Sequence, residues 1–121
     1  MRLLIKKEKR GKLAINKNGI SINKSGIGII GTAIDKVIDK TKDNYVSLGF
    51  DNYNNLCLFI SYDYNKNFYK CCQQISGRAC RANISSKKSI KAIEPFIGNY
   101  EIQDVIIVEN GIRKAKLRKI N

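Results

Sequence analysis

The sequence predicts a single α+β domain in which antiparallel hairpins form a curved sheet or a small barrel, with two short helices packed against it. Three observations predict this fold. Short apolar segments are separated by turn-forming dipeptides, several segments alternate apolar and polar residues as half-buried strands do, and two stretches carry apolar residues at helical spacing. A chain of 121 residues suits one core, so residues 1–121 are expected to form one domain.

The first predicted hairpin joins residues 12–16 to residues 20–23. Asn18-Gly19 lies between them, and this dipeptide readily adopts the positive φ values of a tight turn. In the second strand isoleucines alternate with Ser and Asn, which predicts one face against the core and one toward solvent.

A short amphipathic helix is predicted for residues 32–42, because Ile and Val recur there at helical spacing. Thr32 and Asp35 have the spacing of a capping box at its start. A second hairpin follows, with strands at residues 45–50 and 56–62 joined by a turn rich in Asn and Asp.

The second half of the chain is predicted to contain another helix and another hairpin. No clear pattern assigns residues 70–84, and one edge strand is expected there. A helix at residues 87–94 follows two serines and cannot continue through Pro95, whose ring clashes with the preceding turn. The last hairpin joins residues 105–109 to residues 112–120 across an Asn-Gly dipeptide.

The two halves of the sequence echo each other. Residues 20–25 (Ile-Ser-Ile-Asn-Lys-Ser) resemble residues 84–89 (Ile-Ser-Ser-Lys-Lys-Ser), and an Ile-Gly pair and a hairpin follow each. A duplication would comprise residues 19–62 and 83–120, and stacking the two units would bury a face that neither buries alone. A chance match of this length is the alternative.

The charge of the chain predicts a negatively charged partner. The sequence has 23 Lys and Arg against 10 Asp and Glu, a net charge of +13, which attracts phosphate polymers. A codon bias toward Lys, Asn and Ile is the alternative source of this charge. We expect a nucleic acid, DNA rather than RNA, to contact basic side chains clustered at the N-terminus, around the second helix and on the last strand: Lys6, Lys7, Lys9, Arg10, Arg78, Arg81, Lys87, Lys88, Lys114, Lys116 and Arg118.

The last predicted strand carries a cationic stripe. Lys114, Lys116 and Arg118 share one face, and Ala115 and Leu117 share the other. The stripe is suited to tracking phosphates. Its alternative explanation is an edge strand that uses lysine to prevent aggregation.

Several aromatic residues lie in or beside predicted loops among Asn and Lys, an arrangement suited to stacking on unpaired bases. Half of them are expected to be core or rim residues, and exposure of the others would favour single-stranded nucleic acid over duplex. The set is Tyr53, Tyr62, Tyr64, Phe68 and Tyr69.

Part of the chain resembles the AbrB/SpoVT-type swapped-hairpin DNA-binding domains. The resemblance lies in Ile-Ser-Ile-Asn-Lys at residues 20–24, an Ile/Gly segment ending at Gly31, and the hairpin that follows. The family motif has Pro where this chain has Asn23, and the chain adds residues before the hairpin. The resemblance implies a homodimer with interlocked hairpins, and DNA binding by Lys24 and Lys88.

Residues 26–31 satisfy the G-x-G-x-x-G pattern of dinucleotide-binding folds, with Asp51 at the end of the next strand. The alternating strand before this segment and the hairpins after it oppose that interpretation. The glycines are therefore expected in tight packing, and a nucleotide-binding module is the third hypothesis for function.

Neither a metal, a cofactor nor an enzymatic activity is predicted. The chain has no His, so the usual base for a Ser or Cys nucleophile is missing. The four cysteines lack the paired Cys-x-x-Cys spacing of a zinc site. Cys57 is expected to be a small core residue, and Cys71 and Cys72 are expected to point to opposite faces of an extended segment.

The sequence is thus expected to encode a small, basic, cytoplasmic DNA-binding protein, since no signal peptide and no membrane-length apolar run is present. The alternative from another class is a phage- or plasmid-type anti-defence protein, similar in role to anti-CRISPR inhibitors, that binds a host effector protein. Salt-dependent binding to random DNA or RNA would separate the two.

Overall fold

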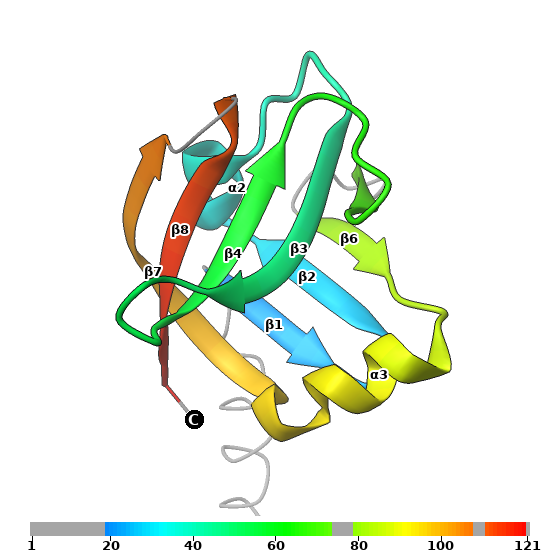
Figure 1. Ribbon diagram of the computed structural model, residues 1–121. Helices are drawn as coiled ribbons and strands as arrows, with labels where there is room; N and C mark the ends of the chain where they lie inside the picture. Colours follow the sequence, from blue (N-terminus) through cyan, green and yellow to red (C-terminus); the bar gives the residue numbers. More distant parts are fainter. Residues whose placement is uncertain (1–18, 74–78, 108–110, 121) are drawn as a thin grey trace, which may run out of the picture.

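The computed structural model describes residues 19–73, 79–107 and 111–120, and the predicted strand at residues 12–16 lies outside them. The described residues form a closed eight-stranded barrel with two short helices (Figure 1). The strands are β1 (Gly19–Asn23), β2 (Gly26–Ile30), β3 (Asn44–Phe50), β4 (Leu56–Ser61), β5 (Tyr69–Gln73), β6 (Ala79–Asn83), β7 (Gly98–Ile107) and β8 (Arg113–Lys119). The helices are α2 (Thr32–Val37), α3 (Lys87–Ile93) and a 3-10 turn, η1 (Glu94–Phe96).

Neighbouring strands are antiparallel throughout, in the circular order β1-β2-β6-β5-β3-β4-β8-β7. The predicted hairpins β3–β4 and β7–β8 are confirmed, and Gly111 has the positive φ of 75° expected beside the last turn. The first hairpin differs from the prediction. β1 pairs with β2 on one edge and with β7 on the other, because the Gly-rich segment forms a strand instead of a loop.

One expectation about edge strands is wrong, and one alternative explanation does not hold. The segment expected to contain one edge strand covers most of β5 and all of β6, and each of these has a strand on either side. β8 likewise pairs with β4 and β7. Because a closed barrel has no edges to protect, edge protection does not explain the lysines of β8.

The helices are shorter than predicted, and only one has the expected cap. α2 ends at Val37, and its N-cap is Gly31 with φ 64°, so the predicted capping box of Thr32 and Asp35 does not form. α3 is capped as predicted, with Ser86 Oγ accepting from the backbone N–H of Ser89. It ends before the turn that contains Pro95.

The core fills the barrel with alternating apolar side chains. On β1 and β2 the inward residues are Ile20, Ile22, Ile27 and Ile29, all fully buried, while Ser21 faces outward. The helices pack at the two ends of the barrel, α2 at one end and α3 at the other (Figure 1). No helix in the described part of the chain is long and apolar enough to cross a membrane.

The strand pairing repeats within the chain. Each half runs strand, strand, helix, strand, strand, and adding four to every strand number reproduces the same circular order. The registers repeat as well. Ile20 of β1 pairs with Ile29 of β2 and with Tyr100 of β7. At the corresponding place, Cys71 of β5 pairs with Ala82 of β6 and with Asn44 of β3.

The predicted sequence echo does not align these equivalent strands. Residues 20–23 lie in β1, whereas residues 84–86 connect β6 to α3. The structural counterpart of β1 is β5, which the sequence comparison left out. The similarity of the two sequence segments therefore does not reflect equivalent positions in the barrel.

Candidate nucleic-acid interface

The structure brings four of the predicted basic residues to one region, which we call the turn cluster: Lys24, Arg81, Lys87 and Lys88. Three other predicted residues, Lys114, Lys116 and Arg118, lie on β8. The remaining ones lie outside the described residues: Lys6, Lys7, Lys9, Arg10 and Arg78.

The turn between β1 and β2 is fixed by local sequence. Asn23 Oδ1 accepts from the backbone N–H of Ser25 at 3.3 Å, which is the Asx type of turn that Asn favours. Gly26 follows because β6 lies very close. A Cβ at this position would stand 2.4 Å from the carbonyl oxygen of Ala82. The turn is therefore held against β6, with Lys24 exposed at its tip.

Arg81 is oriented by neutral side chains. Its Nη2 donates to Asn23 Oδ1 at 3.2 Å and to Ser25 Oγ at 3.3 Å, and its Nε donates to Asn83 Oδ1 at 3.2 Å. Within the described residues no carboxylate lies within ion-pair distance of the guanidinium. An arginine has five N–H donors, so this side chain is positioned yet keeps donors and an uncompensated charge for a phosphate.

Two further lysines follow a segment that is hydrogen-bonded to the turn. The backbone N–H of Ile84 donates to the carbonyl of Ser25 at 2.7 Å, which brings the segment leading into α3 alongside β1 and β2 (Figure 1). Lys87 and Lys88 are exposed in the first turn of α3, which has no acidic residue. Cations there oppose the helix dipole, so these lysines are not placed to stabilise the helix.

The outer surface next to Arg81 is a shallow concavity of about 290 Å³. It is lined by Ser21, Asn23, Gly28, Ile30, Ala79, Cys80 and Arg81. Gly28 is paired directly with Arg81, and a Cβ there would have no neighbour closer than 3.8 Å. A large partner can therefore approach the guanidinium closely.

The stripe on β8 is largely neutralised. Ala115 and Leu117 are buried, so the predicted division of this strand into two faces is confirmed. However, Lys114 Nζ lies 4.0 Å from the carboxylate of Asp51, and Arg118 forms an ion pair with Glu101. Among the described residues only Lys116 of the stripe lacks an ion pair. β7, β1 and β2 also separate β8 from β6, the strand of Arg81.

The five loop aromatics divide as expected into exposed and packed side chains. Tyr53 and Tyr64 are 85% and 76% exposed. The other three are half-buried. Tyr69 donates its hydroxyl to Ser89 Oγ at 2.8 Å, and Tyr62 lies under the cations of Lys42 and Arg113.

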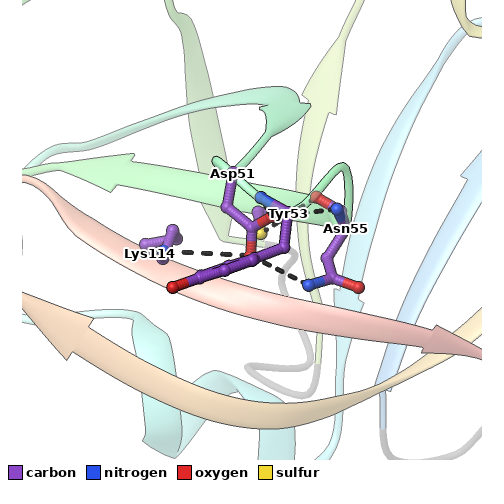
Figure 2. A network of polar contacts seen from close by, with 5 residues as sticks. Asp51, Tyr53, Asn55 and Lys114 are labelled. Atoms are coloured by element: carbon purple, nitrogen blue, oxygen red, sulfur yellow. Dashed lines mark hydrogen bonds and ion pairs between the residues drawn. The ribbon is translucent and has the colours of Figure 1, made fainter.

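The dinucleotide fingerprint has a structural explanation. Its glycines lie in or just after β2, an antiparallel strand, where Gly26 allows the close approach of β6 and Gly31 has a positive φ. Asp51 is used by its own turn. Its carboxylate accepts from the backbone N–H groups of Tyr53 and Asn55 at 2.8 and 2.9 Å (Figure 2).

The cysteines behave as small apolar residues. Cys57, Cys71 and Cys80 are buried, and Cys72 is exposed on the opposite face of β5 from Cys71, as predicted. Burial and the neighbouring thiol of Cys80 raise the pKa of Cys71 to about 12. In the described ranges no group of three or more His, Cys, Asp or Glu is placed to hold a metal ion.

Comparisons of the chain with models of protein families, with curated proteins and with solved structures gave no match. The chemistry of the turn cluster therefore rests on this chain alone. Sequence reasoning named its cations but missed the neutral side chains that orient Arg81. Asn83 was the detectable signal, because it lies two residues after Arg81 and so shares its face of a strand.

Proposed function

We propose that this protein binds nucleic acid, most readily DNA, through phosphate contacts from the turn cluster. The observation that carries the proposal is the guanidinium of Arg81, which neutral acceptors hold on the outer surface against the turn that carries the exposed Lys24. Structural ion pairs are a common use of surface Arg and Lys, and within the described residues this cluster makes none.

The overall charge supports the same function. A net charge of +13 raises the local concentration of any polyanion and speeds its association. Arginine is suited to phosphate because its planar donors match two phosphate oxygens at once. Binding through such contacts depends little on base sequence.

We also propose that the barrel arose by duplication of a strand-strand-helix-strand-strand unit. The repeated strand order and registers support this. The resemblance to AbrB/SpoVT-type domains implies interlocked hairpins from two units, and under this proposal both units belong to one chain. A homodimer of this protein would join two already closed barrels.

Fluorescence anisotropy of labelled DNA at two salt concentrations tests the proposed function. With about four phosphate contacts, raising the salt from about 50 to about 200 mM should weaken binding roughly 100-fold, because each contact releases counterions. Absence of binding at either concentration would contradict the proposal and would favour the alternative of a protein partner, such as a host effector.

A further inference from the structure

A second surface lies two to four strands around the barrel from Arg81. There the outer faces of β3, β4 and β8 form a groove of about 560 Å³, which is within the size range of ligand sites. Three phenylalanines line it together with polar residues at its mouth. The lining residues are Ser47, Leu48, Gly49, Phe50, Asp51, Asn52, Phe59, Phe68, Ile112 and Lys114.

The groove is open because one position on β3 has no side chain. A Cβ at Gly49 would stand 3.0 Å from Cε2 of Phe59, so any larger residue would crowd this ring. Phe50 is 53% exposed, yet it is not loose, since its ring packs edge-on against Phe96 with centroids 5.5 Å apart. The structure thus presents aromatic side chains to solvent in fixed positions.

The mouth of the groove is held by a polar network (Figure 2). The carboxylate of Asp51 accepts hydrogen bonds from the backbone N–H groups of Tyr53 and Asn55 and from Asn55 Nδ2. Lys114 lies on its other side. These hydrogen bonds, with the one from the backbone of Asn55 first, lower the pKa of Asp51. The carboxylate is therefore committed to the turn, and the turn fixes Phe50 and the exposed Tyr53.

We propose that this groove binds an unpaired base of a single-stranded nucleic acid, an inference that rests on the proposed function. Exposed aromatic side chains on a positively charged protein are the arrangement on which bases stack, whatever their sequence. The faces of bases in a duplex are covered by their neighbours and cannot enter such a groove. The charge of +13 selects a base carried on a polyanion over an uncharged apolar ligand.

The position of the two sites also favours a single strand. Arg81 lies on β6, and the groove lies on β3, β4 and β8, which are two, three and four strands away around an eight-stranded barrel. A ligand that reaches both must curve around the molecule. A single strand bends this way readily, whereas a duplex is stiff over about 150 base pairs.

Base-free oligomers separate base binding from phosphate binding. We would measure the affinity of the full chain for a thymidine oligomer, for an abasic oligomer of the same length and for a duplex of the same length. The expected result is that the thymidine oligomer binds about 10-fold more tightly than the abasic one, and that the duplex binds no more tightly than the abasic oligomer.

Variants at Phe50 locate the effect. Phe50→Ala should reduce the ratio of thymidine to abasic affinity toward one while leaving abasic binding unchanged, and Phe50→Trp should restore the ratio. Tyr64→Ala is the matched control, because Tyr64 is an exposed aromatic that does not line the groove. Circular dichroism melting of each variant shows whether the fold is kept.

Each outcome bears on one proposal. Equal affinity for the thymidine and abasic oligomers, or tighter binding of the duplex, would overturn the groove as a base site and leave the turn cluster intact. Binding of thymidine monophosphate as tight as that of the oligomer would also overturn it, in favour of a free-nucleotide site. Failure of every oligomer to bind would instead remove the proposed function.

Discussion

Arg81 on β6 donates a hydrogen bond from Nη2 to Oδ1 of Asn23, which lies 58 residues earlier at the end of β1. The bond joins two halves of the barrel and orients a cation through an amide instead of a carboxylate. The charge of the guanidinium is therefore fixed in place without being neutralised. This combination distinguishes Arg81 from Arg118, whose partner is Glu101.

Asn23→Ala should weaken DNA binding without changing the net charge. Loss of the Oδ1 acceptor frees the guanidinium to sample other positions, and we expect affinity to fall about 3- to 10-fold, the effect of losing one ordinary hydrogen bond. Anisotropy titrations measure it. Asn67→Ala is the control, because Asn67 is exposed and is not among the hydrogen-bond partners of Arg81. Unchanged affinity in Asn23→Ala would show that the orientation of Arg81 is irrelevant.

Gly26→Ala should destabilise the barrel, whereas Gly28→Ala should not. The added Cβ at Gly26 meets a backbone oxygen of Ala82 at 2.4 Å, and forced overpacking costs about 1–3 kcal/mol. At Gly28 the nearest atom is 3.8 Å away, an ordinary contact. Urea denaturation compares the free energies of unfolding. Equal stability of the two variants would mean that β2 and β6 are not as close as described.

Asp51→Asn should destabilise the protein in a pH-dependent way. The folded state lowers the pKa of this carboxyl below its ordinary value of 3.8, mainly through the hydrogen bond from the backbone of Asn55. A lowered pKa contributes stability that is present above that ordinary value and is lost as the pH falls through the folded value. The difference between wild type and variant should therefore be full at pH 7 and should shrink in acid.

Thermal melting at a series of pH values measures this difference. Asp63→Asn is the control, because the Asp63 carboxylate makes no hydrogen bond or ion pair within the described residues. A destabilisation by Asp51→Asn that is as large below pH 3 as at neutral pH would contradict the role assigned to the charged carboxylate.

Cys72 should be the one thiol that reacts quickly in the folded protein. It is exposed, whereas burial covers the other three cysteines and raises the pKa of each, so that little thiolate forms near neutral pH. A thiol-reactive chromogenic disulfide should titrate one group per chain before unfolding and four after it. Rapid reaction of two or more groups would contradict the buried positions of cysteines on β4, β5 and β6.

The sequence was sufficient to predict those parts of the fold that depend on local pattern. The β3–β4 and β7–β8 hairpins follow from turn residues between alternating strands, and the end of α3 follows from Pro95. The predicted curved sheet or small barrel is a closed barrel. The strand β2 was missed because three of its five residues are Ile and two are Gly, a composition that also suits a loop.

The candidate site was predictable as charge and not as geometry. Lys24 and Arg81 were named from composition and resemblance, but their proximity depends on the pairing of β2 with β6, a non-local contact that no local pattern encodes. The same limit applies to β8. Its alternation predicted the cationic face, whereas the carboxylates of Asp51 and Glu101 that neutralise it come from other strands and turns.

The salt dependence of DNA binding tests the turn cluster most directly. Replacing Lys24 and Arg81 together with Gln should reduce the slope of log affinity against log salt by about 2, since each phosphate contact contributes about one unit. Replacing Lys36 and Lys66 with Gln removes the same charge from exposed positions elsewhere on the barrel and should leave the slope nearly unchanged. An equal reduction by both pairs would mean that binding depends on dispersed charge, and the account given for Arg81 would be wrong.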